Sequence, residues 1–135
     1  MLKPLCLLFL IGAFSANAAT SKDLIKSTET WDGQTLPQYS LTQPEVTIKE
    51  IVIAPGEQLP WHQHPAINAG ILLSGELIVY TRDGREKNLK AGEPLIELFN
   101  TSHYGKNISS EPAKIVVFYL AEKDAPVTVL DKEAE

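Results

Sequence analysis

Short apolar segments divided by turn residues fill most of the chain after position 45. Residues 76–82 (ELIVYTR) alternate in the way that places Leu77 and Val79 on one face of an extended strand. Asp83-Gly84 follows at once and is the strongest hairpin signal in the chain. Residues 115–120 (IVVFYL) are apolar throughout, which is typical of a central strand. About eight such segments, roughly 8–12 residues apart and without a sustained helical period, predict an all-β antiparallel sandwich or barrel.

The first long segment of this kind has an irregular pattern. Residues 45–53 are rich in β-branched side chains, but their alternation slips near Lys49 and Glu50, which predicts either a bulge or a change of face. Further strands are expected at residues 67–74, 85–90, 94–99 and 126–130, the last of them at a sheet edge.

The first eighteen residues have a different pattern. Lys3 precedes an apolar run at residues 5–14, and Ala16 and Ala18 follow in an Ala-x-Ala arrangement. This order is typical of a secretory signal peptide cleaved after Ala18. The run is too short to span a hydrocarbon core about 30 Å thick, which takes roughly 20 apolar residues. We therefore expect a periplasmic or secreted protein that has no membrane attachment after cleavage.

Cleavage would leave residues 19–135, enough for one domain. Residues 19–44 read as a polar N-terminal arm, with at most one short helical turn beginning at Ser21. Residues 45–130 would form the barrel and residues 131–135 a tail. Cys6 would leave with the signal, so the mature chain would have no disulfide and no thiolate ligand.

Charge narrows the range of partners. The chain has 12 Lys and Arg against 17 Asp and Glu, a formal net charge of −5, and no basic run. An acidic chain of this kind is a poor binder of nucleic acid. Composition therefore predicts no nucleic-acid partner and leaves a small-molecule ligand as the expected one.

The only three histidines are His62, His64 and His103. His62 and His64 are two residues apart in an extended segment, so both imidazoles can point to the same side and meet one metal ion. His103 comes about forty residues later and could join them if the fold returns it there. Taken alone, the pair could equally be a surface or core pair without metal.

Two blocks of fixed spacing surround these histidines. The first, G-x5-H-x-H-x3-N-x6-G, runs from Gly56 to Gly75, and the second, G-x5-L-x-N-x2-H-x3-N, runs from Gly92 to Asn107. They resemble the paired motifs of the cupin family, G-x5-H-x-H-x3,4-E-x6-G and G-x5-P-x-G-x2-H-x3-N. The resemblance covers about residues 45–130. Three positions depart from the family pattern: the glutamate is Asn68, and the proline and glycine of the second motif are Leu98 and Asn100.

The resemblance implies a cupin-type jelly-roll β-barrel behind a short N-terminal arm. It also implies a divalent metal ion held inside by His62, His64 and His103. Cupin-like thiol dioxygenases are similar in using three histidines. Small cupins often pair through edge strands, so the resemblance further implies a homodimer, in which residues 31–44 could reach the neighbour.

Two residues near the histidines are candidate catalytic groups. Glu97 interrupts an apolar run at residues 95–99, where a carboxylate is costly to bury without a partner. It either lies on an exposed face, or is satisfied by a salt bridge, or points inward as substitute ligand or general base. Asn68 could supply a weak amide oxygen ligand, or orient a bound water or substrate.

Three aromatic residues flank the histidines: Trp61, Phe99 and Tyr104. They are candidates for the walls of an apolar substrate pocket, with plain core packing as the alternative.

The chemistry of the donor set leaves the metal open. Three neutral imidazoles would leave a divalent ion with its full charge and with open positions, which favours an anionic substrate. Zinc, iron, nickel, copper and manganese all remain candidates. The sequence favours a metal-dependent small-molecule enzyme, either dioxygenase-type or a lyase or isomerase. A metal- or ligand-binding module without turnover, and a metal-free structural cupin, are the alternatives.

Overall fold

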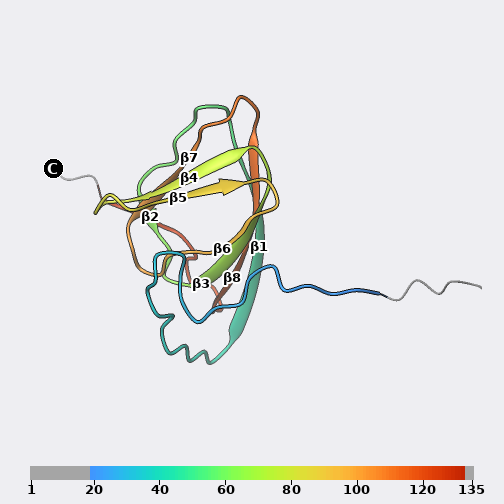
Figure 1. Cartoon of the computed structure of the whole chain (residues 1–135). Coiled ribbons are helices and arrows are strands. Elements are labelled where there is room, and N and C mark those ends of the chain that lie inside the picture. The colour runs from blue at the N-terminus through green and yellow to red at the C-terminus, as the bar shows by residue number, and fades with distance from the viewer. Residues whose placement is uncertain (1–18, 133–135) are drawn as a thin grey trace, which may run out of the picture.

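Nine β-strands in two antiparallel sheets form the fold in the computed structural model, which describes residues 19–132 (Figure 1). The strands are β1 (Pro44–Ile53), β2 (His62–Gln63), β3 (Ile67–Ser74), β4 (Glu76–Thr81), β5 (Glu86–Lys90), β6 (Pro94–Ile96), β7 (His103–Asn107), β8 (Ala113–Glu122) and β9 (Val129–Leu130). These residues contain no helix, so the all-β prediction is confirmed. The predicted signal peptide, residues 1–18, lies outside the described residues.

One sheet has the order β1-β8-β3-β6 and the other the order β5-β4-β7-β2-β9. β8 pairs with β1 along its whole length and with β3 on its other side, which confirms the predicted central strand. β9 is an edge strand, as predicted for residues 126–130, although only two of its residues pair. Two antiparallel sheets of this topology make the jelly-roll fold that the cupin resemblance implied.

The hairpin predicted at Asp83-Gly84 joins β4 to β5. Gly84 has a φ of 83°, a left-handed conformation that glycine adopts without steric cost. Both ends of the pairing match the prediction, because Tyr80 lies opposite Glu86 and Glu76 opposite Lys90.

β1 resolves the irregular alternation at Lys49 and Glu50. Its pairing with β8 runs without a register shift, so of the two predicted alternatives the bulge is excluded in this strand. The apolar side chains instead change face: Val46 is 65% exposed, whereas Ile53 is 1% exposed. A continuous strand can carry apolar residues on both faces in turn because successive side chains point to opposite sides.

The core lies between the two sheets. Its buried members come from six strands: Ile53, Leu72, Leu77, Val79, Leu89, Leu95 and Ile115. Asn107 is also fully buried, and its side chain bonds the backbone carbonyls of Ile53 and Glu111 and accepts from Ser109. These bonds tie the turn between β7 and β8 to the end of β1.

The N-terminal arm lies against its own barrel. The amide of Trp31 donates to the carbonyl of Ile96 at 3.0 Å, and the hydroxyl of Tyr39 donates to the carbonyl of Leu120. The helical turn considered at Ser21 does not form. Leu24 is 59% exposed, so an apolar helical face would find nothing to pack on, and isolated short helices are marginal in water.

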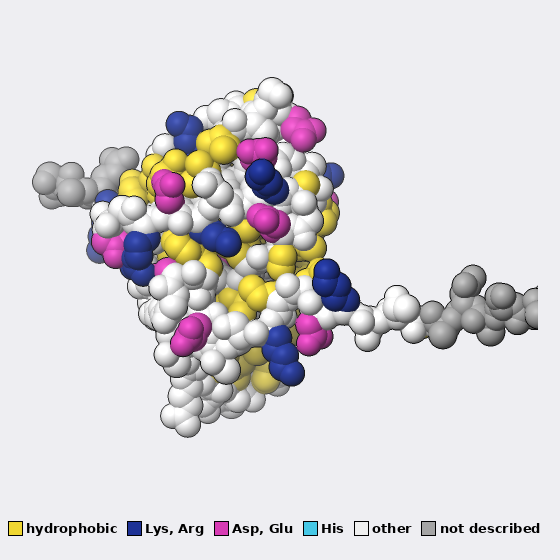
Figure 2. Space-filling view, in the orientation of Figure 1, with side chains coloured by type: hydrophobic (Ala, Val, Ile, Leu, Met, Phe, Trp, Pro, Cys, Tyr) yellow, Lys and Arg dark blue, Asp and Glu magenta, His cyan; other side chains and the backbone are white. Residues whose placement is uncertain are grey.

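The outer face of the four-stranded sheet is unusually apolar. Its exposed side chains are Val46, Ile48, Val52, Leu73, Phe118 and Leu120. Figure 2 shows hydrophobic side chains among the charged ones on one side of the molecule, and no histidine is visible on that side. No helix long and apolar enough to cross a membrane occurs in the part of the chain that the structure describes.

Candidate metal centre

Strand pairing brings His62 and His103 together. The two residues lie directly opposite each other in the register of β2 and β7, and Thr81 on β4 continues the same row. Directly paired residues of antiparallel strands share a face and come within about 5 Å of each other. Both side chains point into the barrel and are buried. The forty-residue gap in the sequence therefore closes through one cross-strand pair.

His64 joins them from the residues just after β2. Its ring centroid lies 4.9 Å from that of His62 and 5.0 Å from that of His103. The backbone amide of Asn100 donates to the carbonyl of His64 at 2.9 Å, which ties the turn before β7 to this position. Asn100 has a φ of 48°, and asparagine is among the few residues that adopt this conformation readily. It thus takes the left-handed conformation suited to the glycine of the family motif.

The orientation of each ring is fixed by a backbone carbonyl. Nδ1 lies 2.8 Å from the carbonyl oxygen of Pro60 in His62, 2.9 Å from that of Val127 in His64, and 2.7 Å from that of Thr101 in His103. A carbonyl can only accept, so Nδ1 carries the proton and donates in each ring. Nε2 is then left with a free lone pair, the usual arrangement of metal-binding histidines.

The free ring nitrogens converge. One ligand nitrogen from each of the three buried rings lies within 4.8 Å of the other two. Nε2 of His103 is also a buried polar atom with no hydrogen bond of normal geometry. A divalent cation at the centre of this cluster would satisfy it, so the three residues fit a metal ion.

Glu97 completes the cluster from the residue after β6. Its Oε2 lies 3.1 Å from Nε2 of His103 and 3.9 Å from Nε2 of His64. Its side chain is buried, so the exposed-face alternative is excluded. The backbone amide of Glu97 donates to the carbonyl of Asn68 at 3.1 Å. The carboxylate therefore enters from the strand beside the one where the family motif has its glutamate.

The pKa values reflect this arrangement. Burial lowers the pKa of His62, and it lowers the pKa of His64 to about 4, so both rings are neutral ligands at pH 7. Burial also acts to lower the pKa of His103, but the contact with Glu97 and its charge outweigh burial and raise that pKa. Burial acts to raise the pKa of Glu97, and the neighbouring His103 reverses this shift, so the carboxyl group stays ionised.

Asn68 points into the same interior. It is 2% exposed, and its amide nitrogen donates to the carbonyl of Ala66 at 3.2 Å. Its Oδ1 has no hydrogen-bond partner among the described residues. A buried carbonyl oxygen without a partner is costly, and it is available to a bound water, ligand or ion.

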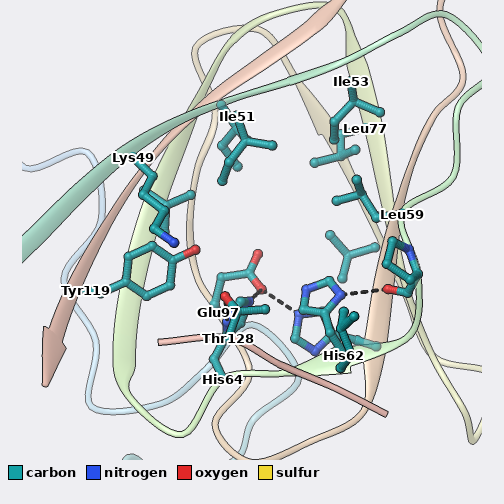
Figure 3. Close-up of a pocket in the computed structure, with 17 residues that line it drawn as sticks. Lys49, Ile51, Ile53, Leu59, His62, His64, Leu77, Glu97, Tyr119 and Thr128 are labelled. Atoms are coloured by element: carbon teal, nitrogen blue, oxygen red, sulfur yellow. Dashed lines mark hydrogen bonds and ion pairs between the residues drawn. The ribbon is translucent and has the colours of Figure 1, made fainter. Parts of the chain in front are cut away.

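A cavity of about 300 Å³ lies against the histidine cluster (Figure 3). All three histidines and Glu97 contribute to its wall. Most of the remaining wall is apolar and comes from both sheets, including Ile51, Ile53, Leu59, Leu77, Val79, Ile115 and Val117. Its volume is at the lower end of small-molecule pockets, which are about 300–1,000 Å³.

The three flanking aromatic residues do not line this cavity. Trp61 and Tyr104 alternate with the inward-facing histidines along β2 and β7, so they face away from the interior. Their rings pack edge to face at 4.6 Å, and the Arg82 guanidinium lies 4.2 Å from the Trp61 ring centroid. Phe99 likewise does not contribute to the cavity wall.

The cavity has polar wall residues that sequence reasoning missed: Lys49, Tyr119 and Thr128. Lys49 Nζ lies 5.8 Å from the Tyr119 ring centroid, and that ring lies 5.5 Å from the His64 ring. Burial raises the pKa of Tyr119 to about 12, so the phenol is protonated at neutral pH. Counting alternate positions back from Ile53 places Lys49 on the inward face. The apolar side chains of Val46 and Ile48, which lie on the other face, made this alternation hard to recognise in the sequence.

Two facing antiparallel sheets with a buried three-histidine cluster define a cupin-type barrel with a candidate metal site. The sequence matches the cupin domain family over residues 49–119, just over half of the chain, and the protein belongs to that family. No curated protein matches the chain.

Solved structures carry the same fold. An oxalate oxidase in complex with the substrate analogue glycolate matches at 21% identity and a TM-score of 0.55, covering 87% of this chain and 62% of that chain. An uncharacterized conserved protein with a double-stranded beta-helix domain from Klebsiella pneumoniae matches at 24% and 0.54, covering 71% and 90%. The DMSP lyase DddQ from Ruegeria pomeroyi matches at 19% and 0.53, covering 63% and 42%. This chain thus spans less than two thirds of the oxidase and lyase chains.

Proposed function

We propose that this protein binds one divalent metal ion through His62, His64 and His103 and converts a small molecule in the adjoining cavity. The observation that carries the proposal is the set of three Nδ1 hydrogen bonds to backbone carbonyls, which turn three free Nε2 lone pairs toward one another. Such preorganisation is typical of metal ligands. Histidines that served only as core packing would not need three matched tautomers.

The donor set supports a catalytic site rather than a closed structural one. Three nitrogen ligands leave coordination positions open to substrate, and a bound cation would supply Lewis-acid or redox chemistry there. Glu97 is placed to hold or accept a proton beside the substrate, since its carboxylate is buried at the cavity wall. Asn68 would orient a bound water or substrate through its unpaired Oδ1. A dioxygenase-type reaction, a lyase reaction or an isomerisation all suit these parts.

A second candidate function is binding without turnover, favoured by the shortage of acid and base groups. Glu97 is the one carboxylate among the residues that line the cavity, and it already contacts His103 at 3.1 Å. A module that only holds a metal or small ligand would keep the histidines and the apolar wall. It would need no group that moves a proton.

Metal analysis tests the shared part of both functions. Protein purified from its exported location, without a histidine tag, should contain about one equivalent of zinc, iron, nickel, copper or manganese by elemental analysis. Three ring nitrogens converging on one point should hold the ion through purification. Sub-stoichiometric metal that added ions do not restore would overturn the metal-dependent form of both functions.

We also propose that two copies pair through the outer face of the four-stranded sheet. Phe118 is 50% exposed and sits among other exposed apolar side chains of β1 and β8, and a cluster of exposed apolar side chains marks an interaction surface. Lys114 and Glu50 lie 3.5 Å apart on this face, so a copy related by two-fold symmetry can place its lysine opposite the glutamate of the first copy.

Sedimentation should give a dimer for the wild type and a monomer for Phe118→Glu. Ile108→Glu, 48% exposed and outside this face, is the matched control and should stay dimeric. A monomeric wild type would contradict the proposal.

A further inference from the structure

One lysine faces the inside of the barrel. β1 turns Thr47, Lys49 and Ile51 toward the interior, because each lies opposite an inward residue of β8, and Val117 is the partner of Lys49. An ammonium group at such a position is costly unless it meets water, an aromatic face or a negative charge. The Lys49 side chain is exposed, so its ammonium group keeps contact with water while it lines the cavity, where a ligand that enters from solvent can reach it.

Lys49 has no carboxylate partner within the described residues. Glu97 is the nearest candidate inside the cavity, but its charge is directed to His103 and His64. Lys114, on the outer face of the same sheet, forms an ion pair with Glu50, so a lysine on that face does find a carboxylate partner. Lys49 instead rests 5.8 Å from the Tyr119 ring centroid, a distance within the range of a cation–π contact.

Lys49 and Tyr119 together form a second polar part of the cavity wall, apart from the histidine cluster. Figure 3 shows both side chains on the opposite side of the cavity from His62, with Ile51, Ile53 and Leu77 along the wall above. The ammonium donates and cannot accept, and the protonated phenol can donate a second hydrogen bond. This pair of donors suits an oxyanion, and the apolar wall suits a hydrocarbon body.

Resting on the proposed function, we propose that the substrate is a small amphipathic carboxylate whose anionic end binds Lys49 and Tyr119. Its apolar body lies along Ile51 and Leu77, and its other end reaches the three histidines. The carboxylate is therefore a handle that orients the molecule and is not the group held by the histidines. The cavity of about 300 Å³ equals about ten water volumes, which limits the body to a short chain or a single ring.

Hexanoate and its neutral isostere hexanamide test this assignment by calorimetric titration. Each is titrated into chelator-treated protein and into zinc-loaded protein. Hexanoate should bind both forms, and hexanamide should bind at least tenfold more weakly, because a neutral amide makes a weaker hydrogen bond to an ammonium group than a carboxylate does. Lys49→Met should weaken hexanoate about tenfold and leave hexanamide unchanged. Lys49→Arg should retain most of the affinity, and the exposed Lys90→Met is the matched control and should bind like the wild type.

The two forms of the protein separate this inference from the metal proposal. Lys49-dependent binding of hexanoate in protein that takes up no metal would support the carboxylate site while the metal proposal fails. Binding that requires zinc and is indifferent to Lys49→Met would place the carboxylate on the metal and overturn the inference. Absence of hexanoate binding in both forms would overturn it as well.

Discussion

His103→Ala should abolish most metal binding. The substitution removes one of three converging ring nitrogens. Removing a residue that only hydrogen-bonds to a metal ligand already lowers metal affinity about 10–100-fold, so we expect the loss of a ligand to lower it about a hundredfold or more. Competition with a chromogenic chelator measures it. Zinc at a hundredfold excess over its Kd should stabilise the wild type by about 2.7 kcal/mol and raise its Tm by roughly 10 °C. The variant should show almost no shift.

The variant also leaves Glu97 buried without its 3.1 Å partner, which could unfold the protein for a reason unrelated to metal. The double variant with His103→Ala and Glu97→Gln removes that unpaired charge, and it should fold and still fail to bind zinc. Tyr104→Phe, on the outward face of the same strand, is the control and should bind zinc like the wild type. Wild-type zinc affinity in a folded His103→Ala variant would contradict the three-histidine site.

The sequence predicted the strands because each is short, marked by turn residues and distinct from a helical pattern. The cross-strand pair of His62 and His103 was not derivable from spacing alone, since register depends on how β2 meets β7. The family resemblance supplied that return of the chain. The turn conformation at Asn100 could not be predicted from the sequence either, because asparagine adopts a left-handed φ only where the surrounding backbone requires it.

The cavity wall was harder to predict than the ligands. Trp61 and Tyr104 are adjacent to histidines in sequence, and adjacency along a strand places a residue on the opposite face. Lys49 was read as a break in an apolar pattern, although it occupies an inward position of a regular strand. The strand register places Lys49 at the cavity wall although its side chain is exposed, so register is a better guide to the wall than adjacency to a ligand.

Exchanging Asn68 and Glu97 should show that one carboxylate can serve from either strand. Glu97→Gln should lower zinc affinity about tenfold or more, because it removes the negative charge 3.1 Å from Nε2 of His103. It should leave the free energy of unfolding of the metal-free protein nearly unchanged, since a neutral amide replaces a buried charge that was costly to desolvate. Chelator competition and urea unfolding of metal-free protein measure the two quantities.

The direction of both changes separates two roles for Glu97. If Glu97 serves only as an ion-pair partner of His103, Glu97→Gln should lower the free energy of unfolding of the protein and leave its zinc affinity unchanged. If Glu97 serves the metal, Glu97→Gln should lower the zinc affinity of the protein and leave its free energy of unfolding nearly unchanged. Glu97→Asn should bind zinc as weakly as Glu97→Gln, and adding Asn68→Glu should restore at least tenfold. The two positions are backbone neighbours, and the exchange conserves total side-chain volume in the buried interior. Failure of the folded double variant to regain affinity would mean that position 68 cannot reach the ion, and that the carboxylate acts only from β6.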